Sequence, residues 1–163
     1  PAIHPFSGVP GDPTLPERIE QWLAETFDEV SNVHIVMRLH PSEDRPPAVS
    51  GARIRYSDVT EPLDSLLCAS DCVVTPSSTV GLEAAMLGVP VVQFMDSVFS
   101  PDLPLGELGV AIAVPSFYEA ASVITRCLDA PASASVGTAG AGTDFNAAAS
   151  VATQISSLLG TNR

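Results

Sequence analysis

Short apolar segments that alternate with helical segments are the feature that most constrains how this chain of 163 residues can fold. The apolar runs are nearly continuous and rich in β-branched residues, which is typical of strands buried on both faces of a parallel sheet. The predicted strands are 33–39, 53–56, 72–75, 89–94 and 110–114. The helices predicted from apolar spacing and capping residues are 15–30, 62–69, 77–87, 116–128 and 146–159. This alternation predicts an α/β fold in which helices flank a parallel sheet on both faces.

Composition favours a folded domain and argues against several classes of protein. Hydrophobic residues make up 45% of the chain, which is too many for a disordered acidic tail. The net charge is −12 and lysine is absent, so non-specific binding to nucleic acid is disfavoured. Cys68, Cys72 and Cys127 have neither disulfide-scaffold nor metal-ligand spacing, and we expect them to be small core residues.

The chain divides by composition into four regions. Residues 1–13 are expected to be irregular, 14–130 to form the α/β domain, 131–143 to be a flexible linker of small residues, and 144–163 to carry a C-terminal helix. Because the chain does not start with methionine, we expect it to be a fragment of a longer protein. No apolar run is long enough to span a membrane and no export leader is visible. The expected location is the cytoplasm, with membrane association at most peripheral.

Ligands of parallel sheets bind beyond the carboxyl ends of the strands, so the residues directly after each predicted strand are candidates for a site. Ser77, Ser78, Thr79 and Gly81 follow strand 72–75 and open the next helix. Main-chain N–H groups at a helix start, assisted by short hydroxyls, bind an oxyanion without lysine. Glycine lets a bulky phosphate approach the main chain. The alternative interpretation is that Ser77 or Ser78 only caps the helix.

Glu83 and His40 extend this predicted phosphate site. Glu83 follows Thr79 by four residues and shares its helical face, where a carboxylate can accept hydrogen bonds from a ribose. The alternative is a first-turn acid that favours the helix dipole. His40 follows strand 33–39 and is suited to contact a phosphate or carry a proton, whereas Arg38 is expected to be a structural ion-pair partner. Neither a metal-ligand cluster nor a glycine-rich nucleotide fingerprint occurs, so we expect no metal and no cofactor.

The segment DCVVTPSSTVGLEAAMLGVPVVQF (71–94), with RLHP (38–41) upstream, resembles the nucleotide-binding core of the C-terminal domain of GT-B glycosyltransferases. The His-Pro and Ser-Ser pair is similar to that of bacterial surface-polysaccharide transferases, including sialyl- and polysialyltransferases. It is also similar to that of CDP-glycerol glycerophosphotransferases and non-hydrolysing UDP-N-acetylglucosamine 2-epimerases. The likeness covers 38–114 and implies a Rossmann-like parallel sheet flanked by helices, the C-terminal half of a GT-B fold.

The resemblance also implies roles and partners. His40 would be the catalytic group at a donor phosphate, Ser77, Ser78 and Thr79 would hold that phosphate, and Glu83 would bind the ribose. The donor would be a UDP-, CMP- or CDP-linked sugar, and the acceptor would bind to a missing N-terminal GT-B domain. Thr75 stands where many retaining GT-B enzymes have a glutamate, and without lysine their arginine-lysine pair is incomplete. These departures favour the His-Pro/Ser-Ser branch.

Three functions are consistent with these residues. The first is the donor-binding half of a glycosyltransferase or glycosyl-phosphotransferase in surface polysaccharide synthesis. The second is half of an enzyme similar to the UDP-N-acetylglucosamine 2-epimerases. The third is a Rossmann-like module without catalytic activity that serves assembly or binding. In the first case we expect the isolated chain to bind a nucleotide without turning over a donor.

Overall fold

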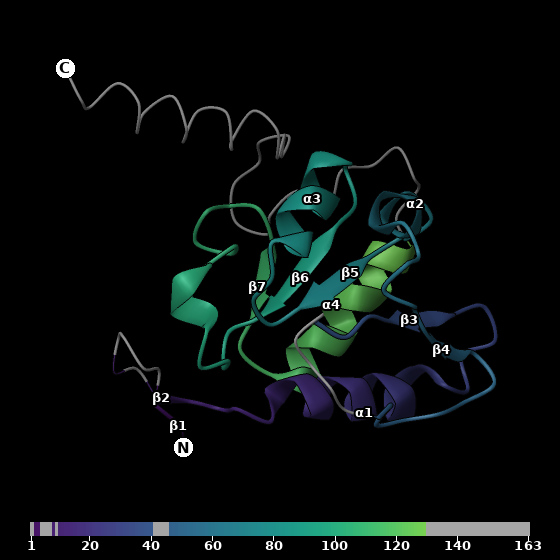
Figure 1. The fold of residues 1–163 in the computed structure, drawn as a ribbon, viewed down its shortest axis with the longest axis horizontal. Coiled ribbons are helices and arrows are strands. Elements are labelled where there is room, and N and C mark those ends of the chain that lie inside the picture. Colours follow the sequence, from purple (N-terminus) through teal and green to yellow (C-terminus); the bar gives the residue numbers. More distant parts are fainter. Residues whose placement is uncertain (1, 4–7, 9, 41–45, 130–163) are drawn as a thin grey trace.

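The computed structural model describes residues 2–3, 8, 10–40 and 46–129 (Figure 1). In chain order its elements are β1 (Ala2–Ile3), β2 (Pro10–Gly11), α1 (Leu15–Phe27), β3 (Ile35–Met37), β4 (Ile54–Tyr56), α2 (Leu63–Cys68), β5 (Val73–Thr75), α3 (Val80–Met86), β6 (Val91–Phe94), a short 3-10 helix (Ser100–Asp102), β7 (Ile112–Val114) and α4 (Phe117–Asp129). The predicted linker 131–143 and C-terminal helix 144–163 lie outside the described residues.

Parallel pairing of the strands confirms the α/β arrangement that the sequence predicts. β5, β6 and β7 form a three-stranded parallel sheet in that order, with β6 in the centre. β3 and β4 form a separate two-stranded parallel sheet. The arrangement is compatible with a Rossmann-like fold, but the strands are hydrogen-bonded as two small sheets where we expected one.

Helices cover both faces of the strands, as Figure 1 shows, with α2 and α3 on one side and α1 and α4 on the other. Alternate strand residues point to opposite faces, so Val91 joins the core with α2 and α3, whereas Val92 joins the core with α1 and α4. The core with α1 and α4 also includes Ile35 of β3 and Val74 of β5. One apolar layer therefore continues across both sheets. An apolar sequence pattern reports burial in that layer and does not distinguish one hydrogen-bonded sheet from two.

The central strand β6 has the strongest burial of the sheet. Its side chains are 0–3% exposed, because β6 has a strand on either side and a helical layer on each face. Phe94, at the end of β6, packs against Trp22 of α1 and Phe117 of α4, with ring centroids 5.8 and 5.0 Å away. These aromatic contacts anchor both helices on the face opposite α3.

The end of α3 agrees with the sequence prediction, whereas its start does not. Gly88 adopts φ 78°, and its N–H donates to the carbonyl of Ala85 at 3.0 Å while Val89 N–H donates to Ala84 at 2.9 Å. This pair of bonds is a Schellman motif, which ends a helix where only glycine avoids strain. The helix begins at Val80 rather than at Ser77 or Ser78, so these serines belong to a loop.

Two short strands lie within the stretch 1–13 that we expected to be irregular. β1 and β2 pair antiparallel, and Asp12 N–H donates to the carbonyl of Asp96 at 3.0 Å. A Cβ atom on Gly11 would lie 2.3 Å from the Cα of Val98, so only glycine permits this approach of two main chains. Residues 10–12 therefore lie beside the segment that follows β6. Within the described part of the chain, no helix has the length and apolar character needed to cross a membrane.

Candidate functional site

The loop that joins β5 to α3, residues 76–79, lies at the carboxyl edge of the three-stranded sheet. Thr75 ends β5 and is buried, whereas Ser77 and Ser78 are half-buried and Thr79 is exposed. The structure thus places the three predicted hydroxyl residues next to one another where ligands of parallel sheets bind. It keeps Gly81 and Glu83 on the adjoining turn of α3.

The main-chain N–H groups of this loop are candidate hydrogen-bond donors to a ligand. Among the described residues, none accepts a hydrogen bond from the N–H of Ser77, Ser78 or Thr79. The next two N–H groups are occupied, since Val80 donates to the Ser78 hydroxyl at 3.2 Å and Gly81 donates to the Ser78 carbonyl at 3.0 Å. Successive N–H groups in a loop form a concave donor set that suits an anion. The helix dipole adds little, because α3 has only seven residues.

The three hydroxyls are not equivalent. Ser77 donates its single hydroxyl proton to the carbonyl of Phe99 at 3.0 Å, so in this conformation it ties two loops together and cannot also donate to a ligand. Ser78 accepts from Val80 and keeps its own proton. No side-chain hydrogen bond caps α3 at Thr79. Ser78 and Thr79 are therefore the hydroxyl donors that remain for an anion.

Gln93 holds this loop in place, and sequence analysis missed it. Its side chain is 0% exposed on the central strand β6. The amide Nε2 donates to the carbonyls of Pro76 at 3.2 Å and Leu103 at 2.8 Å, while Oε1 accepts from Gly106 N–H at 2.9 Å. A lone glutamine within the apolar run VPVVQF was the available signal, because a buried amide must have hydrogen-bond partners.

Gly81 has a packing role that the sequence did not reveal. It is buried, and a Cβ atom there would lie 2.5 Å from Leu105 Cδ1 and 3.3 Å from Thr75 Cγ2. Its Cα faces the core beneath the β6–β7 loop, and its N–H is used within the turn. Close packing therefore explains why this position requires glycine. Access of a phosphate to the main chain at Gly81 stays a prediction.

Glu83 is exposed in the first turn of α3. Its N–H donates to the carbonyl of Thr79 at 3.1 Å, which places the two residues one helical turn apart. The carboxylate is therefore on the solvent side of the helix that follows the loop. This position is compatible with both sequence interpretations, a ribose acceptor and a first-turn acid.

His40 lies on a different sheet from the serines. It is exposed and follows β3, which pairs with β4, whereas Ser77, Ser78 and Thr79 follow β5. Both positions are at carboxyl ends of parallel strands. The role of His40 at a phosphate stays a prediction.

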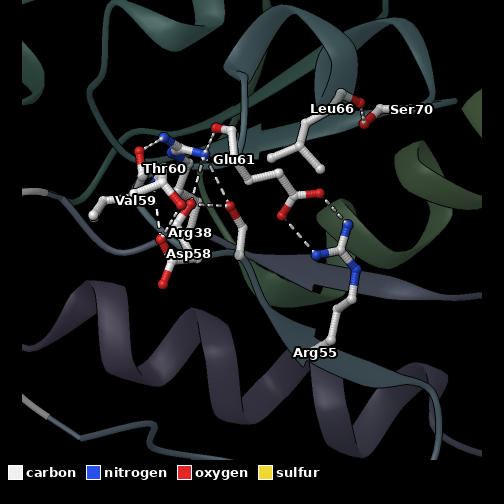
Figure 2. Close-up of polar contacts among 9 residues, drawn as sticks. Arg38, Arg55, Asp58, Val59, Thr60, Glu61, Leu66 and Ser70 are labelled. Carbon is white, nitrogen blue, oxygen red and sulfur yellow. Dashed lines mark hydrogen bonds and ion pairs between the residues drawn. The ribbon is translucent and has the colours of Figure 1, made fainter.

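Arg38 has a structural role, but among the described residues it binds main-chain carbonyls and a hydroxyl, where we expected an ion pair. Its guanidinium donates to the Ser57 hydroxyl at 2.9 Å. It also donates to the main-chain carbonyls of Glu61 at 2.9 Å and Val59 at 3.2 Å, as Figure 2 shows. These bonds fix the loop between β4 and α2. Arg38 is therefore committed to the protein and is not a phosphate ligand.

The neighbouring Arg55 is committed as well (Figure 2). Its two terminal nitrogens donate to the two carboxylate oxygens of Glu61 at 2.8 and 2.9 Å. The guanidinium lowers the pKa of Glu61, and hydrogen bonds from Thr60 lower the pKa of Asp58. Arg38 and Arg55 are thus both bound to the loop between β4 and α2.

Chemically, the main-chain N–H groups and hydroxyls of this loop can donate hydrogen bonds to an oxyanion. Within the described residues no group of three or more histidine, cysteine, aspartate or glutamate side chains is arranged to hold a metal ion. Comparisons of the chain with family models, curated proteins and solved structures found no match.

Proposed function

We propose that this chain is the donor-nucleotide-binding, C-terminal domain of a glycosyltransferase or glycosyl-phosphotransferase of surface polysaccharide synthesis. The observation that carries the proposal is the 76–79 loop, with the N–H groups of Ser77, Ser78 and Thr79 left without acceptors among the described residues. It lies at the carboxyl edge of a parallel sheet, where nucleotides bind in α/β proteins. The resemblance of 71–94 and 38–41 to GT-B enzymes supplies the reaction class.

In this proposal the loop binds the phosphate or diphosphate of a nucleotide-activated sugar, in the cytoplasm where such donors are made. Neutral donors suit a protein with a net charge of −12, because they hold the anion locally without a basic patch. Ser78 and Thr79 contribute hydroxyls, and Glu83 accepts hydrogen bonds from the ribose. His40 contacts the donor phosphate.

The proposal also assigns roles in the transfer step. When the sugar leaves, negative charge grows on the nucleotide phosphate, and fixed N–H donors with His40 stabilise that charge. Reacting groups must be held within about 3–3.5 Å, so a second domain has to bring the acceptor to the donor. The proposal therefore expects the isolated chain to bind a nucleotide and to transfer nothing.

Titration of the chain with UDP, CMP, CDP and GDP by calorimetry tests the proposal. One nucleotide should bind. Ser78→Ala should lower the affinity for it about tenfold or more, as expected for one lost hydrogen bond to a charged group. Glu83→Gln should weaken binding of the nucleotide but leave binding of inorganic phosphate unchanged. Ser122→Ala and Glu25→Gln, on exposed faces of α4 and α1, are matched controls. They should change neither the affinity for the nucleotide nor that for inorganic phosphate.

Each result has a distinct meaning. Equal affinity of the wild type and Ser78→Ala would remove the loop from the site. Absence of binding by all four nucleotides would overturn nucleotide binding by this domain and favour an assembly module. Fusion to the natural N-terminal half, followed by donor-hydrolysis and epimerisation assays, then distinguishes a transferase from an epimerase.

A further inference from the structure

Two of the three cysteines meet in the core at the edge opposite the candidate site. Cys72 directly precedes β5, whereas Ser77 lies beyond its other end. Cys127 lies near the end of α4 and is 3% exposed. Both belong to the core formed by α1, α4 and the strands.

The topology explains why residues so far apart in sequence come together. β7 runs parallel to β6 and β5, and α4 starts just after β7 and returns along the sheet. A helix that starts at the carboxyl edge ends at the amino edge, where β5 begins. Figure 1 shows the yellow-green end of α4 beside the start of β5.

The two thiols also interact directly. Contact with Cys127 and burial raise the pKa of Cys72, while contact with Cys72 lowers the pKa of Cys127. The Cys72 S–H also lies within reach of the Val73 carbonyl, at a sulfur–oxygen distance of 3.9 Å. Cys72 is half-buried, so the pair is not sealed from a small solute. Cys68, by contrast, is exposed at the end of α2.

We propose that Cys72 and Cys127 are a redox-responsive pair that forms an intramolecular disulfide when the protein meets a peroxide. Two S–H bonds and the peroxide O–O bond break, one S–S bond forms, and hydrogen peroxide is reduced to two molecules of water. The two sulfurs supply the two electrons and the two protons. The bond joins the start of β5 to the end of α4 and closes a loop that contains α3, β6 and β7.

Such a bond restricts the unfolded chain more than the folded one, because its two ends are already neighbours in the native protein. Oxidation should therefore stabilise the domain, and a dithiol reductant should reverse the effect. The pair lies at the amino edge of the sheet, so this proposal is independent of nucleotide binding at the carboxyl edge.

Mass spectrometry of alkylated protein tests whether Cys72 and Cys127 form the disulfide. The wild-type chain is treated with hydrogen peroxide, unfolded and reacted with iodoacetamide. Reduced protein should take three labels, one for each cysteine, and oxidised protein should take one, on Cys68. The oxidised chain should be two hydrogens lighter, and proteolysis should yield one cross-linked peptide that contains Cys72 and Cys127. Its thermal midpoint should be higher than that of the reduced chain.

Single substitutions distinguish the proposed Cys72–Cys127 disulfide from other oxidation products. Cys68→Ser should keep the cross-link and remove any disulfide-linked dimer. Cys72→Ala should remove the cross-link and the peroxide-dependent rise in thermal midpoint, while its circular dichroism reports whether it still folds. The proposal is overturned if peroxide leaves three alkylatable thiols in the wild type. It is also overturned if peroxide gives only sulfinic acids or dimers through Cys68.

Discussion

Replacement of Gln93 by methionine tests whether a buried amide fixes the candidate loop. The two side chains are similar in length, so Gln93→Met removes hydrogen bonds without opening a large cavity. The carbonyl of Pro76 and the N–H of Gly106 lose their partner, and the carbonyl of Leu103 loses one of two, since it also accepts from Leu105 N–H at 2.9 Å. A net loss of about 0.5–1.5 kcal/mol per hydrogen bond gives about 1.5–4.5 kcal/mol for the three.

Urea unfolding followed by tryptophan fluorescence measures this loss. The chain has one tryptophan, Trp22, which packs 5.8 Å from Phe94 on the strand that carries Gln93. Gln21→Met is a matched control, since Gln21 is exposed on α1 and the same substitution there should cost about 0.5 kcal/mol or less. If Gln93→Met stays within about 0.5 kcal/mol of the wild type, the three contacts do not stabilise the fold as argued.

A charged counterpart adds a pH test at the same position. Gln93→Glu keeps the acceptor for Gly106 N–H but turns a second oxygen towards two carbonyls. Burial and these carbonyls disfavour the ionised form, so the folded-state pKa of this carboxyl lies above its unfolded value. The variant should be most stable in acid and lose stability as pH rises through the folded-state pKa. A pH-independent difference from the wild type would refute this reasoning.

Three further predictions concern other parts of the fold. Gly81→Ala should destabilise the chain by about 1 kcal/mol in urea, because the contact with Leu105 outweighs the gain in helix propensity; a more stable variant would show that this side chain gives way. Tyr56 donates to Glu20 at 2.7 Å, and burial raises the pKa of its hydroxyl. The stability that this hydroxyl contributes should be complete below its unfolded pKa and should fall in alkali as pH passes the folded pKa, a fall absent from thermal scans of Tyr56→Phe. Arg38→Met should raise hydrogen exchange of the main-chain amides in 57–61 while leaving 76–79 unchanged, since the guanidinium binds the former segment. Equal exchange in 57–61 of the wild type and the variant would contradict this role of Arg38.

Local patterns predicted the elements well but not their exact extent. The alternation of apolar and helical segments gave every strand from β3 to β7 and every helix from α1 to α4, because burial in layers imposes those periods. Gly88 marked the end of α3 because a left-handed residue there requires glycine. The helix start was misplaced to Ser77 or Ser78, since serine is as common in a loop as at a cap.

The candidate site was predictable in place but not in detail. The rule that ligands bind at carboxyl ends of parallel strands selected the serine loop from sequence alone. The partner of Ser77 could not be predicted, because Phe99 belongs to a loop that follows the next strand. The packing role of Gly81 could not be predicted, because Leu105, which fills the space above it, is distant in sequence.

The sequence by itself determined the order of strands and helices, the parallel class of the sheets and the location of the hydroxyl-rich loop. These features depend on residues that are close together in the chain. Only the tertiary structure decided that Gln93 holds that loop, that Arg38 serves the 57–61 loop, and that Cys72 meets Cys127. Each of these contacts joins residues on different elements, and hydrogen bonds or thiol contacts across elements leave no period in the sequence.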